Sequence, residues 1–401
     1  IFIASSMLQV GAIASLTSLV HALNPAAWML VQLLFCIATL RLTREMGWPT
    51  LRGFLGIWSA QRTRLAAFAR GLSQWGVITL MAICGVLWMS LVGQAVAPLQ
   101  NFDDRMYHAS RVIYWIQNQS VFPFDTHNIR QTMIPFGSEL FVLWPVLFTK
   151  TEAMGRIVFW LAFPLAAIGQ YYLLRALKLS QTVALVGVLI LVSTPLVASS
   201  AVGLKPEIWS IVTLLGIAYW VVSICTQPDA SKAQYFFLGT FTVLSINVRS
   251  FPVSMIPSLL LIVWWAPSPF SCIARFKALA AGWVCAGVLS SLLVPLAFNT
   301  ALYHHPLGPQ EVRRVVQADI TPQVIYTHAV RFVFLLLELP DVPASSETRS
   351  RFSSAANQFI YSSGAGAPLA GENKGAWPGS FVYSLPEHST RFSLWGLLWI
   401  P

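Results

Sequence analysis

Residues 75–97 read WGVITLMAICGVLWMSLVGQAVA, a run without a single Asp, Glu, Lys or Arg. A helix that crosses the hydrocarbon core of a bilayer needs about 20 apolar residues, and this run supplies them without interruption. Further apolar runs lie at 2–20, 26–40, 157–174, 182–199, 207–225, 235–247, 252–265 and 279–298. We therefore predict an all-α, polytopic bundle of transmembrane helices, with about 9–11 spans.

The composition of the whole chain agrees with an integral membrane protein. Of its 401 residues, 56% are hydrophobic and 10% are charged, whereas a soluble domain carries about 25% charged residues. The net charge is +10, but the basic residues are spread over short loops between apolar runs, as is typical of loops that face an anionic membrane surface. We therefore expect the lipid bilayer as a partner and no nucleic acid. The five cysteines lack the spacing of metal ligands.

The basic residues also predict an orientation. The loop at 41–74 carries six arginines against the single acid Glu45, so it is expected in the cytoplasm. Strict alternation of spans then places 98–156, 200–206, 248–251 and 299–391 outside. For a bacterial cell this predicts a multi-pass protein of the inner (plasma) membrane, with its outer segments facing the periplasm or exterior.

The same pattern divides the chain into five parts. The expected parts are N-terminal transmembrane helices with a basic cytoplasmic loop (1–97), an outer loop with interfacial helices (98–156), a transmembrane core (157–298), a second outer region (299–391) and the start of a further span (392–401). The chain begins at Ile1 inside an apolar run and ends inside another. We therefore expect it to be part of a longer protein.

The first outer segment holds the densest ionisable chemistry, beginning Asn101-Phe102-Asp103-Asp104. Asn101 can cap a helix, and the two acids fall in its first turn, where the helix dipole favours negative charge. Helical spacing then predicts one polar stripe, made of Asp103, Tyr107, Arg111 and Trp115, and an opposite, membrane-facing stripe, made of Val112, Ile113 and Ile116. We predict an amphipathic helix at the membrane surface whose polar side faces a substrate; a solvated helix with aromatic anchors is the alternative.

These residues also resemble a known family. The pattern Asp-x-x-x-Tyr-His-x-x-Arg-Val-x-x-Trp-x-Gln-Asn, which starts at Asp103, resembles the first outer loop of GT-C fold glycosyltransferases. These polyprenyl-phosphate-sugar-dependent enzymes include protein O-mannosyltransferases and lipid A aminoarabinose transferases. The continuation at Arg130, Gln131, Pro135 and Glu139 is similar to bacterial members. The resemblance covers residues 95–310 and consists mainly of topology outside the motif.

The resemblance implies roles for individual residues. Asp103, with Asp104 as its neighbour, takes the place of the loop acid that acts as general base or metal-binding acid. Glu207 stands where a second acid, commonly Asp, is expected, and Arg249 takes the place of a basic residue near the next outer turn, suited to a phosphate. The other candidate substrate-binding residues are Tyr107, His108, Arg111, Trp115, Arg130, Gln131, Glu139 and Lys205.

Displacing a lipid-linked phosphate at an anomeric carbon needs a base for the acceptor's proton and cations for the departing phosphate. The implied function is therefore that of an enzyme, a GT-C-type glycosyltransferase. It would transfer a sugar from a polyprenyl-phosphate donor to a lipid, glycan or protein acceptor on the non-cytoplasmic face. No cofactor is certain; a divalent cation, Mg or Mn, held by Asp103 and Glu207 is left open.

Two other functions stay open. A transporter or flippase of lipid-linked glycans predicts charges in the middle of spans and broken helices in paired halves, whereas the spans here are nearly free of charge at their centres. A surface-glycan polymerase or ligase shares the donor chemistry but needs arginines in a later large outer loop. Arg313 and Arg314 keep that alternative open.

Overall fold

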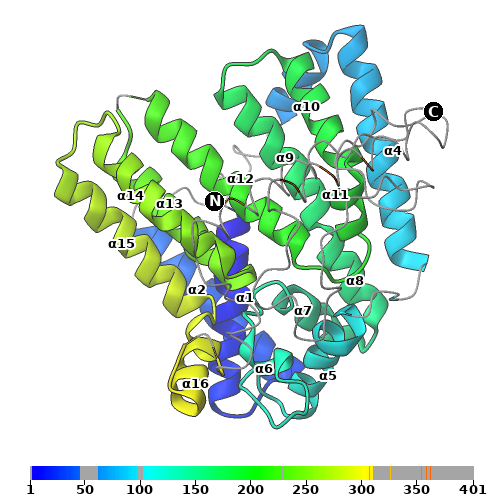
Figure 1. The fold of residues 1–401 in the computed structure, drawn as a ribbon, viewed down its shortest axis with the longest axis vertical. Helices are drawn as coiled ribbons and strands as arrows, with labels where there is room; N and C mark the ends of the chain where they lie inside the picture. The colour runs from blue at the N-terminus through cyan, green and yellow to red at the C-terminus, as the bar shows by residue number, and fades with distance from the viewer. Residues whose placement is uncertain are drawn as a thin grey trace. The chain divides into compact units, whose positions relative to one another are not determined.

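The structure is a computed structural model that describes residues 2–45, 62–96, 99, 103–227, 229–306, 308–309, 326, 354, 358 and 362. Within this part of the chain the regular secondary structure is helical, without a strand (Figure 1). Four helical stretches are long and apolar enough to cross a membrane: Gln74–Val96, Glu152–Ala176, Glu207–Thr226 and Cys272–Leu289. The all-α fold of membrane-spanning helices is thus confirmed for the described residues.

Most predicted spans coincide with helices to within a few residues. These are α1 (Phe2–Leu19), α2 (Pro25–Glu45), α4 (Gln74–Val96), α12 (Glu207–Thr226) and α13 (Lys232–Val248). Three other predicted spans are each divided into two helices. The span at 157–174 corresponds to α8 (Glu152–Trp160) and α9 (Ala162–Ala176), and the span at 182–199 to α10 (Gln181–Ser193) and α11 (Pro195–Ser200). The span at 252–265 corresponds to the 3₁₀ helix η2 (Phe251–Met255) and α14 (Ile256–Trp265). The break between α10 and α11 falls at Pro195, whose ring removes a backbone hydrogen-bond donor.

The predicted span at 279–298 is wrong in its bounds. Helix α15 (Cys272–Leu289) begins earlier and ends at a buried serine turn, after which α16 (Leu293–Tyr303) begins. Ser291 has a positive φ of 62°, which interrupts the helix, and its hydroxyl donates to the carbonyl oxygen of Gly11 in α1 at 2.8 Å. Arg275, which was expected in a cytoplasmic loop, lies on α15 and donates to the carbonyl oxygen of Ala266 at 2.6 Å.

Helix α7 (Leu140–Thr149) was missed because it lies inside the predicted outer segment. Its sequence LFVLWPVLFT buries seven of its ten side chains. Ten residues form a helix of about 15 Å, too short for a hydrocarbon core of about 30 Å. Instead, α7 packs against α8 and α1 within the bundle, so part of the predicted outer segment belongs to the protein's core.

The chain divides into two compact units, one made of Ile1–Val192 and Val197–Leu296 and the other of Ser193–Leu196 and Ala297–Pro401. In the first unit, α12 packs against both α9 and α13, and α13 packs against α15 (Figure 1). The motif segment at 103–139 therefore shares a unit with the long apolar helices.

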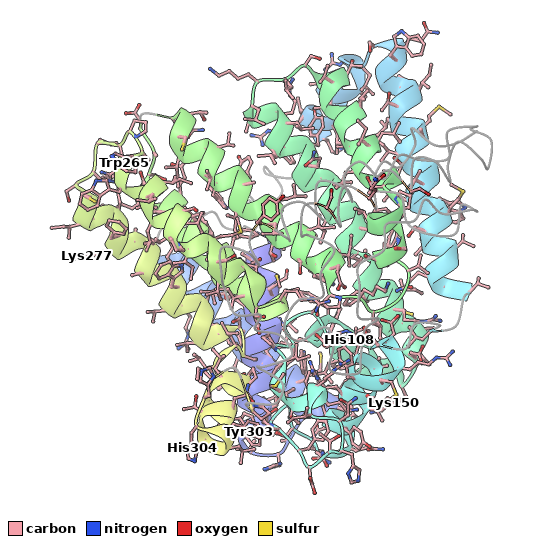
Figure 2. All side chains as sticks on the ribbon, viewed as in Figure 1. His108, Lys150, Trp265, Lys277, Tyr303 and His304 are labelled. Carbon is pink, nitrogen blue, oxygen red and sulfur yellow. The ribbon has the colours of Figure 1, made fainter. Side chains whose placement is uncertain are left out.

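Several loops that were expected on the same side of the membrane contact one another in the first unit. At one end, the amide of Gly137 donates to the carbonyl oxygen of Asn247 at 2.9 Å, and the amide of Leu23 donates to Gln119 at 3.0 Å. We call this the site end, formed by the loops at 20–24, 103–139, 201–207 and 247–250. Away from the site end, the side chain of Gln181 donates to the carbonyl oxygen of Phe68 at 3.1 Å. This hydrogen bond joins the loops at 41–74 and 175–181, which were both expected in the cytoplasm. Trp265, at the far end of α14, lies well away from His108 of the site end (Figure 2).

Helices α13 and α15 approach through glycines. A Cβ at Gly239 would collide with the carbonyl oxygen of Leu279, and a Cβ at Gly282 would collide with that of Phe236. Small residues let membrane helices bring their backbones together. The two glycines thus set the spacing of α13 and α15.

We expect Gly282→Leu to destabilise the protein by about 1–3 kcal/mol or more, because the side chain must force the two helix backbones apart. Thermal unfolding of the detergent-purified protein measures the effect. Gly287→Leu is the matched control on the same helix, since a Cβ there meets no atom within 4 Å. Equal melting temperatures for the two variants would contradict the close approach of α13 and α15.

Candidate functional site

The motif residues lie on two joined segments, the π-helix η1 (Asp104–Ala109) and helix α5 (Ser110–Gln117). A π-helix is rare and is frequently found at functional sites. The predicted helix and its amphipathic character are confirmed, since Ile113 and Tyr114 are exposed whereas the opposite face is buried.

The polar stripe does not face an open substrate site as predicted. Tyr107, Arg111 and Trp115 are buried inside the protein, and Val112, expected to face the membrane, is buried as well. Trp115 packs edge-on against Phe136 at 4.9 Å between ring centroids. A charged stripe can be buried only where each charge finds a partner, and the segment before α7 provides these partners.

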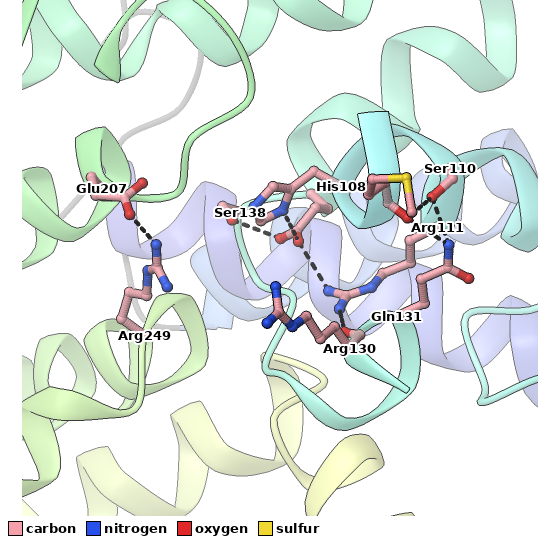
Figure 3. Close-up of polar contacts among 10 residues, drawn as sticks. His108, Ser110, Arg111, Arg130, Gln131, Ser138, Glu207 and Arg249 are labelled. Atoms are coloured by element: carbon pink, nitrogen blue, oxygen red, sulfur yellow. Dashed lines mark hydrogen bonds and ion pairs between the residues drawn. The ribbon is translucent and has the colours of Figure 1, made fainter. Parts of the chain in front are cut away.

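Glu139 is the central partner, at the start of α7. Its Oε1 accepts a hydrogen bond from Nη1 of Arg111 at 2.9 Å and lies 2.7 Å from Nδ1 of His108 (Figure 3). Its Oε2 accepts from the hydroxyl of Ser138 at 2.7 Å. Arg111 also donates from Nη2 to the carbonyl oxygen of Arg130 at 2.5 Å. We call His108, Arg111, Ser138 and Glu139 the sealed cluster.

Glu139 is ionised despite its burial. Burial raises the pKa of Glu139, but Arg111, His108 and the hydrogen bonds from His108 and Ser138 outweigh it and hold that pKa at about 2. Burial lowers the pKa of Arg111, and Glu139 opposes that shift. The side chains of Arg111 and Glu139 are 0% and 1% exposed, so they lie inside rather than on a substrate-facing surface. Their role is to fasten η1 and α5 to the segment before α7.

Gln131 is likewise buried and holds the loop together. Its side-chain nitrogen donates to the carbonyl oxygen of Met106 and to the hydroxyl of Ser110, both at 2.8 Å, and its oxygen accepts from Thr126 at 2.8 Å (Figure 3). The predicted substrate contact of Gln131 is therefore replaced by an internal contact between η1, α5 and the 126–131 loop.

Asp104 is buried against the loop that precedes α12. It accepts a backbone hydrogen bond from Leu204, and its carboxylate lies where a Cβ of Gly203 would stand. Gly203 has a φ of +128°, in a region that favours glycine. Burial raises the pKa of Asp104, whereas Leu204, His108 and Lys205 oppose the shift without cancelling it. Asp104 thus joins η1 to this loop instead of facing an open site.

Gln94, near the end of α4, is a residue that sequence analysis missed. Its side chain accepts from the amide of Gly203 at 2.6 Å and donates to the carbonyl oxygens of Gly203 and Arg156, at 2.8 and 3.0 Å. Gln94 therefore holds the loop that covers Asp104. The sequence does contain one signal for Gln94, which is its amide side chain within an otherwise apolar run. Polar residues inside a membrane span are costly and usually make a structural or functional contact.

We expect Asp104→Asn to keep or raise thermal stability at neutral pH, on the order of a few degrees. Because the folded pKa of Asp104 lies above its ordinary value of 3.8, its stabilising contribution is complete below pH 3.8 and is lost as the pH rises through the folded pKa. The neutral side-chain amide of Asn carries no charge at pH 7, so it avoids the loss of stability that ionisation of Asp104 causes. Its oxygen can still accept the backbone hydrogen bond from Leu204. The difference in melting temperature between variant and wild type should shrink as the pH falls towards 4. A variant less stable at pH 7.5 would contradict this.

Two ion pairs at the site end are open to solvent, unlike the sealed cluster. Asp103 Oδ1 lies 4.0 Å from Nη1 of Arg130, and the two side chains are 47% and 58% exposed. Glu207, in the first turn of α12, pairs with Arg249 at the end of α13, and their side chains are 44% and 33% exposed (Figure 3). We call these the open pairs.

Tyr107 is buried, and its pKa responds to several of these charges. Burial raises the pKa of its phenol to about 12, Asp103, Glu139 and Glu207 add to that shift, and Arg249 opposes it. The convergence of Asp103, Glu207 and Arg249 on one site stays a prediction. Lys205, half-buried beside Glu207 in the chain, opposes the raised pKa of Asp104.

The residues do not fit the divalent cation that was left open. Among the described residues no three His, Cys, Asp or Glu side chains gather as metal ligands. Asp103 and Glu207 each pair with an arginine instead.

An apolar groove lies among helices of the first unit. It has a volume of about 410 Å³ and is lined by Ile3, Ser6, Gln9, Val10, Trp28, Met29, Gln32, Phe141, Trp144, Val158, Leu161, Leu165 and Trp209. Phe141 stacks on Trp209 with 4.1 Å between ring centroids. These two aromatic residues follow Glu139 and Glu207 by two positions each, a spacing that on a helix places the aromatic and the acidic side chains on different sides.

Several predictions fall outside the described residues. They concern Asn101 as a cap, Arg313 and Arg314, nearly all of the outer region at 299–391, and the further span at 392–401.

Compared with known proteins, the chain matches no family model, no curated protein and no solved structure. The GT-C resemblance therefore remains an expectation from the motif residues.

Proposed function

We propose that the chain is a GT-C-type membrane glycosyltransferase that uses a polyprenyl-phosphate-linked sugar. The observation that carries the proposal is the partly exposed Glu207–Arg249 pair at the ends of α12 and α13, in the same compact unit as an apolar groove. Trp209 of α12 lines that groove. A donor with a charged head and an apolar tail matches a unit that offers both kinds of surface.

Within this proposal Asp103 is the general base. The Asp103 side chain is half-exposed, whereas Asp104 is buried and accepts a hydrogen bond from the backbone of Leu204. The Asp103 carboxylate takes the proton of the acceptor hydroxyl while the acceptor oxygen bonds to the anomeric carbon. The bond from that carbon to the phosphate oxygen breaks, and its electron pair leaves with the phosphate.

The phosphate is held by the cations of the site end. Arg249 and Arg130 present partly exposed guanidinium groups, which bind phosphate oxygens in a bidentate way, and Lys205 adds positive charge nearby.

The groove accepts the first isoprene units of the tail. Its aromatic and aliphatic lining gains free energy from burying apolar surface, and its helices are ones that the bilayer surrounds. By the alternation of basic loops, the site end faces the periplasm across a bacterial inner membrane, so the acceptor is a lipid, glycan or protein of that compartment.

A transfer assay tests the function. The purified protein in liposomes is supplied with radiolabelled polyprenyl-phosphate sugars and a bacterial membrane extract, and the label is followed into lipid, glycan and protein fractions. We expect label in an acceptor together with release of polyprenyl phosphate. A flippase would instead move the donor between leaflets with its sugar–phosphate bond intact, and that result would overturn the proposal.

A further inference from the structure

We propose that Glu207 is a counter-charge for Arg249 that the donor's phosphate displaces and that returns when the product leaves. This inference depends on the proposed function and adds a mechanism of exchange at the same site. Its starting point is the contrast between ion pairs that are sealed in the protein and ion pairs that are open to the site.

The exposure of the two kinds of pair differs sharply. Arg111 and Glu139 are 0% and 1% exposed, and breaking a buried pair of this kind leaves an uncompensated charge in the interior. The Glu207 and Arg249 side chains are about one third to one half exposed, so water reaches part of each side chain, although Oε2 of Glu207 is itself buried. An exposed pair contributes little to stability, and it can therefore open without unfolding its surroundings.

The helices that carry the open pair do not depend on it. Glu207 begins α12 and Arg249 follows α13, and these two helices pack along their length, with Trp209 and Leu244 buried. The site is therefore preformed before and after the pair opens. Only the Glu207 side chain has to move.

A phosphate and a carboxylate compete for Arg249 because both accept the same pair of parallel N–H groups from a guanidinium. The phosphodiester of a donor carries one negative charge, as Glu207 does, so the exchange leaves the charge beside Arg249 unchanged. The monoester product carries more negative charge than that, and it would bind more tightly than the donor. A neighbouring carboxylate that competes for Arg249 opposes this and favours product release.

Binding of the product lipid tests the exchange without requiring transfer. The full chain in nanodiscs is titrated with polyprenyl phosphate, with the corresponding polyprenol that lacks phosphate, and with inorganic phosphate. We expect Glu207→Gln to bind polyprenyl phosphate about fivefold more tightly than wild type, equivalent to about 1 kcal/mol. Glu207→Asp, which keeps the charge, should stay close to wild type, and Arg249→Gln should weaken binding in both the wild-type and the Glu207→Gln background.

The matched control is Glu152→Gln. Glu152 also begins a helix, and its side chain is 54% exposed and pairs with the buried Arg156 at 3.5 Å, but it is not a member of the open pairs. Its removal should leave binding unchanged. Thermal unfolding of every variant checks that the fold is intact, and Glu207→Ser replaces Glu207→Gln if the latter is unstable.

The outcomes separate the two proposals. If wild type binds polyprenyl phosphate but Glu207→Gln binds it equally or more weakly, the exchange is wrong while the proposed function stands. If wild type binds polyprenyl phosphate no better than polyprenol, the proposed function itself fails. If Glu207→Gln gains affinity for inorganic phosphate alone, the site takes a soluble anion and the lipid-linked exchange is overturned.

Discussion

Asp103→Asn should lower the rate of sugar transfer by about 10²–10⁴-fold, because a positioned general base contributes roughly that much to catalysis. The fold should remain intact, since the Asp103 side chain is half-exposed and its ion pair with Arg130, itself exposed, is open to solvent. The measurement is the initial rate of label transfer, with the rate constant and the donor KM determined separately. We expect the rate constant to fall with little change in the donor KM.

Asp104→Asn is the matched control for this prediction. It makes the same chemical change one residue along the chain, at a carboxylate that is buried and bonded to Leu204. Asp125→Asn provides a second control, at an exposed acid of the same segment. Full activity of Asp103→Asn together with an inactive Asp104→Asn would remove Asp103 from the role of base.

Glu139→Gln should destabilise the protein by about 3–5 kcal/mol, because it leaves Arg111 as an uncompensated charge in the interior. The pKa of Glu139 is lowered from 4.5 to about 2. Its stabilising contribution is therefore present above about pH 4.5 and is lost as the pH falls towards 2. Melting temperatures of wild type and variant should differ by a constant amount above pH 5 and approach one another below pH 4.5.

A compensating substitution sharpens this test. Glu139→Leu combined with Arg111→Met removes both charges, and replacing a buried pair by apolar residues of similar volume is often neutral or stabilising. The double variant should recover stability that Glu139→Leu alone loses. If Glu139→Gln were as stable as wild type at pH 7, Glu139 would not hold η1 and α5 to α7.

The spans were predictable because a bilayer imposes a simple rule on sequence. About 20 apolar residues are needed for a crossing, and α4 and α12 satisfy the rule without ambiguity. The rule failed where apolar sequence serves another purpose. Helix α7 is apolar because it is buried in protein, and the run at 279–298 is cut by a positive φ at Ser291, which hydropathy cannot detect.

The sequence predicted which residues belong to the site better than it predicted how they are arranged. The acids and arginines of the motif gather at one end, as expected, but an amphipathic pattern cannot tell a polar face in water from a polar face whose charges are paired internally. Arg111 and Glu139 are 28 positions apart in the chain, and no local signal links them. The same limit hid Gln94, whose partner Gly203 lies 109 positions away.

The serine turn between α15 and α16 has a consequence for biosynthesis. Buried turns must satisfy their backbone and hydroxyl groups within the protein, and Ser291 does so on α1, through Gly11 and through a 2.7 Å contact with Ser15. Chains generally fold from the N-terminus during synthesis. The surface of α1 that contacts Ser291 is therefore synthesised some 280 residues before the serine turn itself. A circular permutant that makes α1 last would present this turn to the membrane before its partner exists.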